Sequence, residues 1–186
     1  MRIRRARQSD LPTIMRWRQE AATWLAAIGS DQWSDAGLTR DSFEQRVSDS
    51  ITAGETWIAE DDDGTPLGTI AVDSTADAGL WKPEELHGAY VIHRMIIDRT
   101  AAGRDVGSKL IDHAVHLAQR NSRVRLILDA WTTNEGLHRY YRSQGFRHVR
   151  TVPGHWTPSA ALFEREVRAT TKAGHQSTRQ CTSPPP

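Results

Sequence analysis

Residues 91–108 read VIHRMIIDRTAAGRDVGS. The first part of this stretch belongs to an apolar-rich run over 89–98, which predicts a central strand. A glycine-bearing turn and a helix follow that strand. The buried face of that helix is marked by residues at helical spacing: Val106, Leu110, Ile111, Ala114, Leu117 and Ala118. The first turn of a helix leaves backbone N–H groups without partners, and the helix dipole favours negative charge there. This order of elements therefore predicts an anion site at 103–108.

The turn itself is not specific enough to decide its role. Gly103 and Gly107 lie at the junction, beside Arg104, Ser108 and Lys109. Glycine lets a backbone approach a bound anion closely. However, the turn is neither a P-loop, which needs Gly-Lys-Ser/Thr after a four-residue gap, nor the G-x-G-x-x-G of a dinucleotide fold. On these residues alone, a plain strand–helix turn is as good an interpretation as a phosphate site.

The rest of the chain predicts a mixed α/β fold. Further strands are predicted over 3–6, 56–60, 67–72, 125–130, 147–152 and 161–166. Further helices are predicted from Ser9 or Asp10 to near Gly29, from a cap at Thr39 to Gly54, and over 133–144, while 74–88 reads as irregular. The order is β-α-α-β-β-β-α-β-α-β-β. Because hairpins coexist with a crossover helix, we expect a mixed, mostly antiparallel central sheet flanked by helices.

Composition limits the class of protein. A chain of 186 residues suits one domain, which we place at 1–168, and the polar, proline-ended segment 169–186 is typical of a disordered tail. The net charge of +1 gives no field for nucleic acid or membrane, and no apolar run is long enough to span a bilayer. The single cysteine, Cys181, favours a cytoplasmic protein. No metal site is expected, since the aspartates at 61–63 read as a solvated hairpin turn.

A second motif follows the next strand: Asn134, six residues, Tyr141, three residues, then Gly145 and Phe146. With this motif the sequence resembles the Gcn5-related N-acetyltransferase (GNAT) superfamily. In that family a central strand leads into Arg/Gln-x-x-Gly-x-Gly/Ala and a helix, and a further strand precedes the Asn and the Tyr-x3-Gly-Phe. The matching parts here are 92–98, 102–107, 126–129 and 134–146. The resemblance extends weakly over 1–167.

The resemblance implies an N-acyltransferase that moves an acetyl or other acyl group from a coenzyme A thioester to a small-molecule amine by direct attack. It implies donor-binding roles for Gly103, Arg104, Val106, Gly107 and Ser108 at the pyrophosphate, and for Met95, Ile97 and Asn134 at the pantetheine arm. Tyr141 would protonate the departing thiolate as general acid, with a core tyrosine as the alternative. Its neighbour Tyr140 is expected to be a packing residue.

The general base is less clear from the sequence. An amine nucleophile must lose its proton, so a carboxylate or imidazole near the thioester is expected. His93 on the central strand is our first candidate and Asp129 at the end of the next strand is the second, with a structural role an equal alternative for either. A loop bearing Asp31, Trp33 and Asp35 would border the acceptor site and suit a cationic amine, although a solvated loop explains it equally.

Two positions depart from the family pattern. Ala102 replaces the usual Arg or Gln, and Asp105 replaces the middle glycine. A carboxylate beside a pyrophosphate is unfavourable unless it points away or pairs with a cation such as Arg104. Asp105 is therefore either a residue of the first helical turn or a sign that the donor is a pantetheine thioester on an acyl carrier protein. A non-catalytic acyl-CoA-binding or regulatory member of the fold is a further alternative, and a homodimer is a possible assembly.

Overall fold

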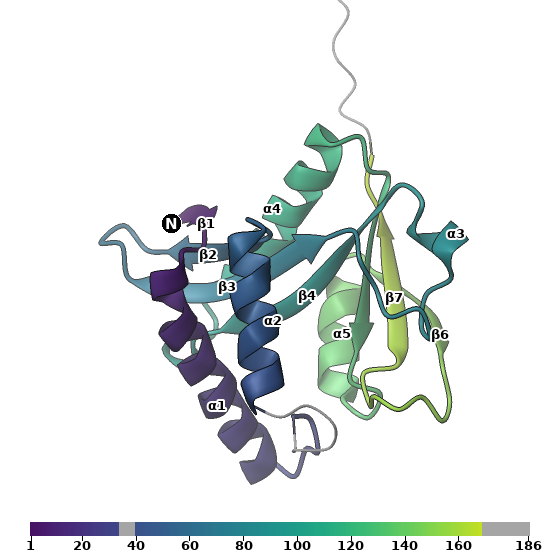
Figure 1. Ribbon diagram of the computed structural model, residues 1–186. Helices are drawn as coiled ribbons and strands as arrows, with labels where there is room; N and C mark the ends of the chain where they lie inside the picture. Colours follow the sequence, from purple (N-terminus) through teal and green to yellow (C-terminus); the bar gives the residue numbers. More distant parts are fainter. Residues whose placement is uncertain (34–39, 169–186) are drawn as a thin grey trace, which may run out of the picture.

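The computed structural model describes residues 1–33 and 40–168 (Figure 1). Seven strands form one sheet in the order β1-β2-β3-β4-β5-β7-β6. They are β1 (Arg2–Arg5), β2 (Thr56–Glu60), β3 (Pro66–Asp73), β4 (Ala89–Ile97), β5 (Arg125–Ala130), β6 (Arg147–Thr151) and β7 (Ala161–Glu166). Every neighbouring pair is antiparallel except β4 and β5, which are parallel. The predicted mixed, mostly antiparallel sheet is confirmed.

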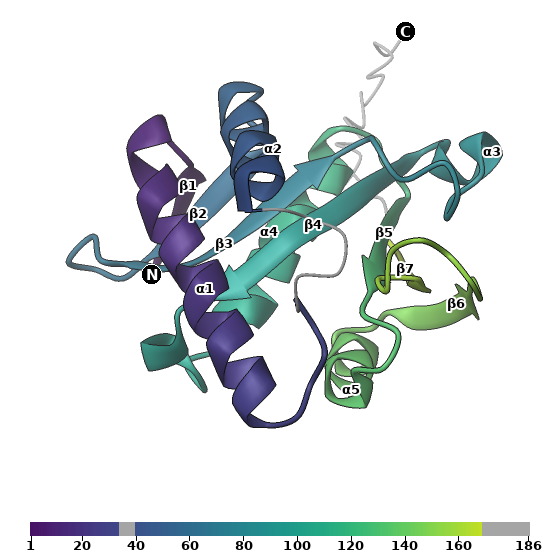
Figure 2. The same ribbon diagram turned by 60° about the horizontal axis from the view of Figure 1, so that its bottom comes forward.

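Helices cover both faces of the sheet. They are α1 (Leu11–Ala27), α2 (Arg40–Thr52), α3 (Pro83–Leu86), α4 (Val106–Arg120) and α5 (Glu135–Ser143), with 3-10 turns at Gln8–Asp10 and Arg99–Ala101. Figures 1 and 2 show α1 and α2 on one face, and α4 and α5 on the other. The short α3 interrupts the segment that was predicted as irregular; Pro83 begins it, and Glu85 caps it through the N–H of Lys82. The predicted cap at Thr39 and the tail 169–186 lie outside the described residues.

An ion-pair cluster anchors the start of α1 to the edge of the sheet. The Arg4 guanidinium on β1 donates to both oxygens of Asp10, at 2.7 and 2.9 Å, and also contacts Glu60 on β2. The hydrogen bond from Arg4 is the main reason that the pKa of Asp10 lies below its usual value. Ser9 or Asp10 was predicted to cap the helix. Asp10 is the N-cap residue, but its carboxylate accepts hydrogen bonds from Arg4 and from the N–H of Arg7 instead.

Apolar side chains fill both sides of the sheet. On one side, α4 buries the predicted stripe completely at Leu110, Ile111, Ala114 and Ala118, against strand residues such as Ile70 and Phe163. On the other side, Trp17 and Phe43 from α1 and α2 pack on Ile58. A third cluster, which includes Trp81, Val91 and Leu162, lies where the segment before β4 covers the other end of the sheet. Apolar area buried in this way is the main favourable term in folding.

The sheet opens between β4 and β5. These strands pair only at Ala89–Arg125, Tyr90–Leu126 and Val91–Ile127, and no later pairs join them in the described chain. Beside β3, the register of β4 shifts after His93, where Arg94 adopts a positive φ of 47°. Such a bulge bends the strand that carries it. The outer half of β4 therefore diverges from β5, as Figure 2 shows.

A buried hydrogen-bond cluster holds the turn that follows β4. Asp98 accepts the indole N–H of Trp17 at 2.7 Å, and the N–H and hydroxyl of Thr100 at 2.8 and 2.6 Å. Burial raises the pKa of Asp98, but these hydrogen bonds and the nearby Arg16 outweigh burial, so the pKa is lowered. Through Trp17, α1 thereby holds in place the turn that connects β4 to α4.

Removal of the Trp17 donor tests this connection. The Trp17→Phe change leaves a buried carboxylate oxygen of Asp98 without its partner and leaves a small void, so we expect a loss of about 2–4 kcal/mol of unfolding free energy. Urea unfolding measures it. The matched control is Trp156→Phe, since Trp156 is 60% exposed, and it should change stability by less than about 0.5 kcal/mol. A Trp17 variant as stable as the wild type would contradict the proposed connection.

Candidate active site

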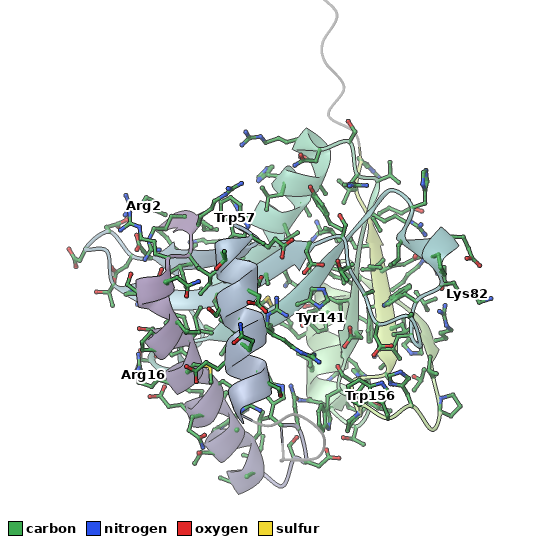
Figure 3. The ribbon with its side chains drawn as sticks, viewed as in Figure 1. Arg2, Arg16, Trp57, Lys82, Tyr141 and Trp156 are labelled. Carbon is green, nitrogen blue, oxygen red and sulfur yellow. The ribbon has the colours of Figure 1, made fainter. Side chains whose placement is uncertain are left out.

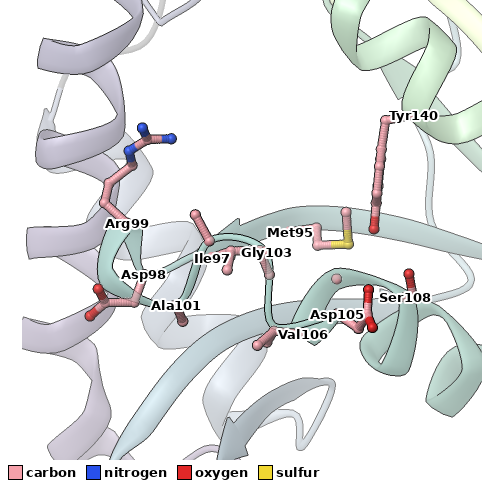
Figure 4. A pocket seen from close by; sticks show the side chains of 12 residues that line it. Met95, Ile97, Asp98, Arg99, Ala101, Gly103, Asp105, Val106, Ser108 and Tyr140 are labelled. Carbon is pink, nitrogen blue, oxygen red and sulfur yellow. The ribbon is translucent and has the colours of Figure 1, made fainter.

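A cavity of about 290 Å³ lies between the end of β4 and the start of α4. Figure 4 shows the side chains that surround it. Its walls are formed by Met95, Ile97, Asp98, Arg99, Ala101, Ala102, Gly103, Asp105, Val106, Gly107, Ser108 and Tyr140. Most residues predicted to bind the donor meet here: Met95, Ile97, Gly103, Val106, Gly107 and Ser108. Arg104 and Asn134 do not line the cavity.

The first turn of α4 presents hydrogen-bond donors to this cavity. The first N–H to be paired is that of Lys109, which donates to the Asp105 carbonyl at 3.1 Å. The N–H groups of Val106, Gly107 and Ser108 have no partner among the described residues, and no side chain caps the helix. Since all three belong to residues of the cavity wall, the helix start has the capacity to bind an anion that the sequence predicted.

Asp105 is the N-cap residue of α4 and has a left-handed backbone, with φ at 56°. Glycine favours this conformation, and aspartate tolerates it better than most residues. The glycine of the family pattern is therefore replaced by one of the few side chains that suit the backbone. The carboxylate still lines the cavity. Asp105 thus fits the turn sterically and adds a negative charge beside the donors of α4.

Tyr140 also belongs to the cavity, which corrects the expectation that it only packs. In Figure 4 its ring extends from α5 toward the start of α4, with the hydroxyl near Ser108. A Cβ atom built on Gly107 would lie 2.3 Å from the Tyr140 hydroxyl oxygen. Any side chain at Gly107 would therefore displace Tyr140. The sequence missed this residue because adjacent helical positions point about 100° apart, and nothing in the spacing showed which one meets α4.

Tyr141 lies in the core behind the opening of the sheet. It is 7% exposed, and its ring contacts those of Phe146 and Phe163, with centroids 5.8 and 6.0 Å away. In Figure 3 it lies near the centre of the molecule, between α5 and β4. Burial, assisted by Tyr140 and the negative charge of Asp129, raises the pKa of the phenol. Tyr141 therefore keeps its proton at neutral pH.

Asp129 and His93 come from the two strands that diverge. Both lie on the face of the sheet opposite α4, because their neighbours Leu128 and Ile92 belong to the core on the α4 side. Burial raises the pKa of Asp129, while the Ser159 hydroxyl and His93 oppose the rise. Asp129 interacts electrostatically with both His93 and Tyr141. Asp129 is therefore within electrostatic range of both His93 and Tyr141, although Tyr141 belongs to the core on the α4 side of the sheet.

The hydrogen bonds of His93 fix its neutral tautomer. Its Nε2 atom lies 2.9 Å from the Thr75 carbonyl oxygen and 3.2 Å from an Asp73 carboxylate oxygen. Both partners are acceptors, so Nε2 carries the proton and Nδ1 keeps a lone pair. Burial raises the pKa of Asp73, but the hydrogen bonds from His93 and from the Thr75 N–H contribute to holding that pKa below its usual value. No spacing in the sequence connected Asp73 with His93, which are neighbours only through the pairing of β3 with β4.

The segment after α1 is tied to the start of α5. Asn134 caps α5 by accepting the N–H of Leu137 at 2.9 Å, and its side-chain amide donates to Gln32 at 2.5 Å. Asp31 accepts the indole N–H of Trp131 at 2.8 Å and the Thr133 hydroxyl at 2.6 Å. Both residues predicted to face a ligand therefore make structural contacts.

Trp33 packs against the core beneath α1 and α2, whereas Asp35 lies outside the described residues. Within the described part of the chain, no three His, Cys, Asp or Glu side chains come together in a way that could hold a metal ion. No helix described by the structure is long and apolar enough to cross a membrane.

Comparison with known proteins decides the family. The model of the acetyltransferase (GNAT) family matches residues 11–146. The chain belongs to the GNAT family. A curated relative, the uncharacterized N-acetyltransferase YesJ of Bacillus subtilis (strain 168), is 26% identical over 150 residues, which are 80% of each chain. The resemblance seen in the two sequence motifs is confirmed, and the protein is an acetyltransferase enzyme.

Solved GNAT structures share the fold. A GNAT acetyltransferase from Listeria monocytogenes 4b F2365 is 26% identical, covers 89% of this chain and 94% of its own, and superposes with a TM-score of 0.73. The PaiA N-acetyltransferase of Thermoplasma acidophilum, solved in complex with coenzyme A, is 17% identical with a TM-score of 0.68, and covers 89% of this chain and 98% of its own. The seven-stranded sheet of this GNAT chain is thus that of its structural neighbours.

The contact between Gly107 and Tyr140 is testable as a double-mutant cycle. Gly107→Ala should destabilise the enzyme by about 1–3 kcal/mol through overpacking, although alanine is the better helix former. Tyr140→Phe removes the oxygen atom that clashes, and the next atom of the ring lies 3.3 Å from the added Cβ. The double variant should therefore recover most of the lost stability in urea unfolding. Additive losses would show that the two residues do not touch.

Proposed function

We propose that this GNAT enzyme transfers an acetyl or other acyl group from a coenzyme A thioester to an amine of a small molecule. One observation supports the proposal: β4 and β5 stop pairing after Val91 and Ile127, and the cavity at the start of α4 lies at the far end of β4. His93 and Asp129 lie on the two diverging strands, and Tyr141 interacts electrostatically with Asp129. A bound thioester would thus have groups for phosphate binding and for proton transfer on the same path. The complex of the PaiA N-acetyltransferase with coenzyme A supports this choice of donor.

The donor would be held mainly by backbone groups. The free N–H groups of Val106, Gly107 and Ser108 suit the oxygens of a pyrophosphate, and they need no net charge on the protein to do so. The edge of β4 at Met95 and Ile97 is not paired with β5, so its backbone is available to the pantetheine arm. Coenzyme A, when bound, supplies the activated thioester. The carboxylate of Asp105 opposes this binding electrostatically, which makes the one-phosphate arm of an acyl carrier protein the alternative donor.

Proton transfer would be divided between the two sides of the gap. Tyr141, whose raised pKa keeps the phenol protonated, would donate a proton to the departing thiolate. His93 would accept the proton of the attacking amine at Nδ1, directly or through water, because Nε2 is already bonded to Asp73 and Thr75. Asp73 would orient the imidazole. Asp129 is the second candidate for the base, since its raised pKa brings a carboxyl group closer to neutral pH.

The proposal is tested by thiol release from acetyl-CoA with a panel of amines, compared between the wild type and Tyr141→Phe. Loss of the acid should lower kcat by about 10²-fold or more and leave KM for acetyl-CoA nearly unchanged. Tyr90→Phe, a change in a half-buried tyrosine outside the cavity, is the control and should keep full activity. Absence of wild-type turnover with every amine would favour a non-catalytic acyl-CoA-binding protein. Full activity of the Tyr141 variant would remove Tyr141 from the mechanism.

The pH profile of kcat/KM distinguishes the two candidate bases. A general base must be unprotonated, so activity should rise with pH as the base loses its proton. His93→Gln should abolish this rise and lower the plateau, while Asp129→Asn should retain it. Asp73→Asn should lower the plateau without abolishing the rise, because it only removes the acceptor that orients the ring. If the rise is lost in Asp129→Asn alone, Asp129 is the base.

A further inference from the structure

Tyr140 brings a hydroxyl group to the cavity, where no described residue gives it a regular hydrogen bond. The hydroxyl oxygen is shielded from solvent and makes no hydrogen bond with the described residues. The Ser108 hydroxyl is close enough to lower the pKa of the phenol, but the contact does not satisfy the distance and angles of a regular hydrogen bond. Buried hydroxyl groups are normally paired, since an unpaired one lowers stability. A group without a partner in the wall of a ligand cavity points to a ligand as its partner.

The surroundings of this hydroxyl define the chemistry of that ligand. It lies against Gly107, whose N–H and that of Ser108 are also free. Burial, together with the charges of Asp105 and Asp112, raises the pKa of the phenol despite the opposing effect of Ser108, so Tyr140 remains a donor at neutral pH. Several donors therefore meet at one place. The group that satisfies all of them is an acceptor with several oxygens, such as a phosphate.

The opposite wall of the cavity offers few alternatives. Ala102, which replaces the Arg or Gln of the family pattern, has no side-chain donor. Arg99 lies over the Trp24 ring at 3.8 Å, and Figure 4 shows it across the cavity from Tyr140. Asp98 is already occupied by Trp17 and Thr100. A ligand held by the backbone N–H groups of α4 can therefore receive an additional hydrogen bond from Tyr140, which reaches the cavity from α5.

We infer that Tyr140 is a donor-binding residue, whose hydroxyl donates a hydrogen bond to a phosphate oxygen held by the first turn of α4. This inference rests on the proposed function and adds to it a side-chain contact from α5. It also assigns different roles to adjacent tyrosines: Tyr140 binds the phosphate, and Tyr141 acts at the thioester. Glycine at position 107 would then serve this contact as well, because a larger residue there would push the Tyr140 hydroxyl away from the first turn of α4.

The test compares Tyr140→Phe with the wild type in two measurements: the affinity for coenzyme A, which should fall, and the thermal stability, which should not fall. Calorimetric titration with coenzyme A should show an affinity loss of about tenfold or more, the usual effect of a lost hydrogen bond to a charged group. Thermal unfolding of the free variant should occur at the same or a higher temperature, because the change removes an unpaired buried hydroxyl. A residue that only packs would instead lose stability and keep its affinity.

Two comparisons complete the experiment. Pantetheine, which lacks phosphate, should bind both proteins equally, and Tyr90→Phe should bind coenzyme A like the wild type. Equal binding of coenzyme A by the wild type and Tyr140→Phe, or an equal loss for pantetheine, would overturn the inference and leave the proposed function standing. A wild type that does not bind coenzyme A at all would overturn the proposed function and the inference together.

Discussion

The separation of β4 from β5 organises the candidate site. The two strands share three residue pairs and then diverge, and the bulge at Arg94 bends β4 away. Backbone polar groups along the opened edge need partners, so a polar ligand arm can replace the missing strand. The surrounding elements serve this gap: α4 begins at one end of it, and α5 approaches from the side of β5. The arrangement of the candidate site follows from where the sheet stops pairing.

Helix α5 connects the two ends of the candidate site. Adjacent residues of a helix point about 100° apart, so Tyr140 reaches the first turn of α4 while Tyr141 enters the core near Asp129. The start of α5 is held by Asn134 and by Trp131, which bind Gln32 and Asp31 of the segment after α1. Residues about 100 positions apart in the chain therefore set the position of both tyrosines. A substitution at Asp31 or Gln32 should therefore shift the start of α5 and, with it, the two tyrosines.

The departures from the family pattern have different physical meanings in the structure. Asp105 occupies a left-handed position, so the glycine of the family pattern suits the backbone conformation that this turn requires. Ala102 removes a side-chain donor from one wall, and the opposite wall carries the unpaired hydroxyl of Tyr140. The sequence indicated that both positions were unusual. It could not indicate Tyr140, because Gly107, against which the Tyr140 hydroxyl lies, belongs to a helix that begins more than 30 residues earlier in the chain.

The sequence alone predicted the order of the elements apart from α3, the mixed sheet and the glycine-bearing turn before α4, because helical periodicity, β-rich runs and glycine positions are local properties. It also placed Tyr141, His93 and Asp129 on elements that meet. The contacts between side chains were set by tertiary packing: Asn134 caps α5, Asp73 lies beside His93, and Tyr140 lines the cavity. These contacts depend on strand register and on the rotation of α5, which many packed residues set together and no local pattern records.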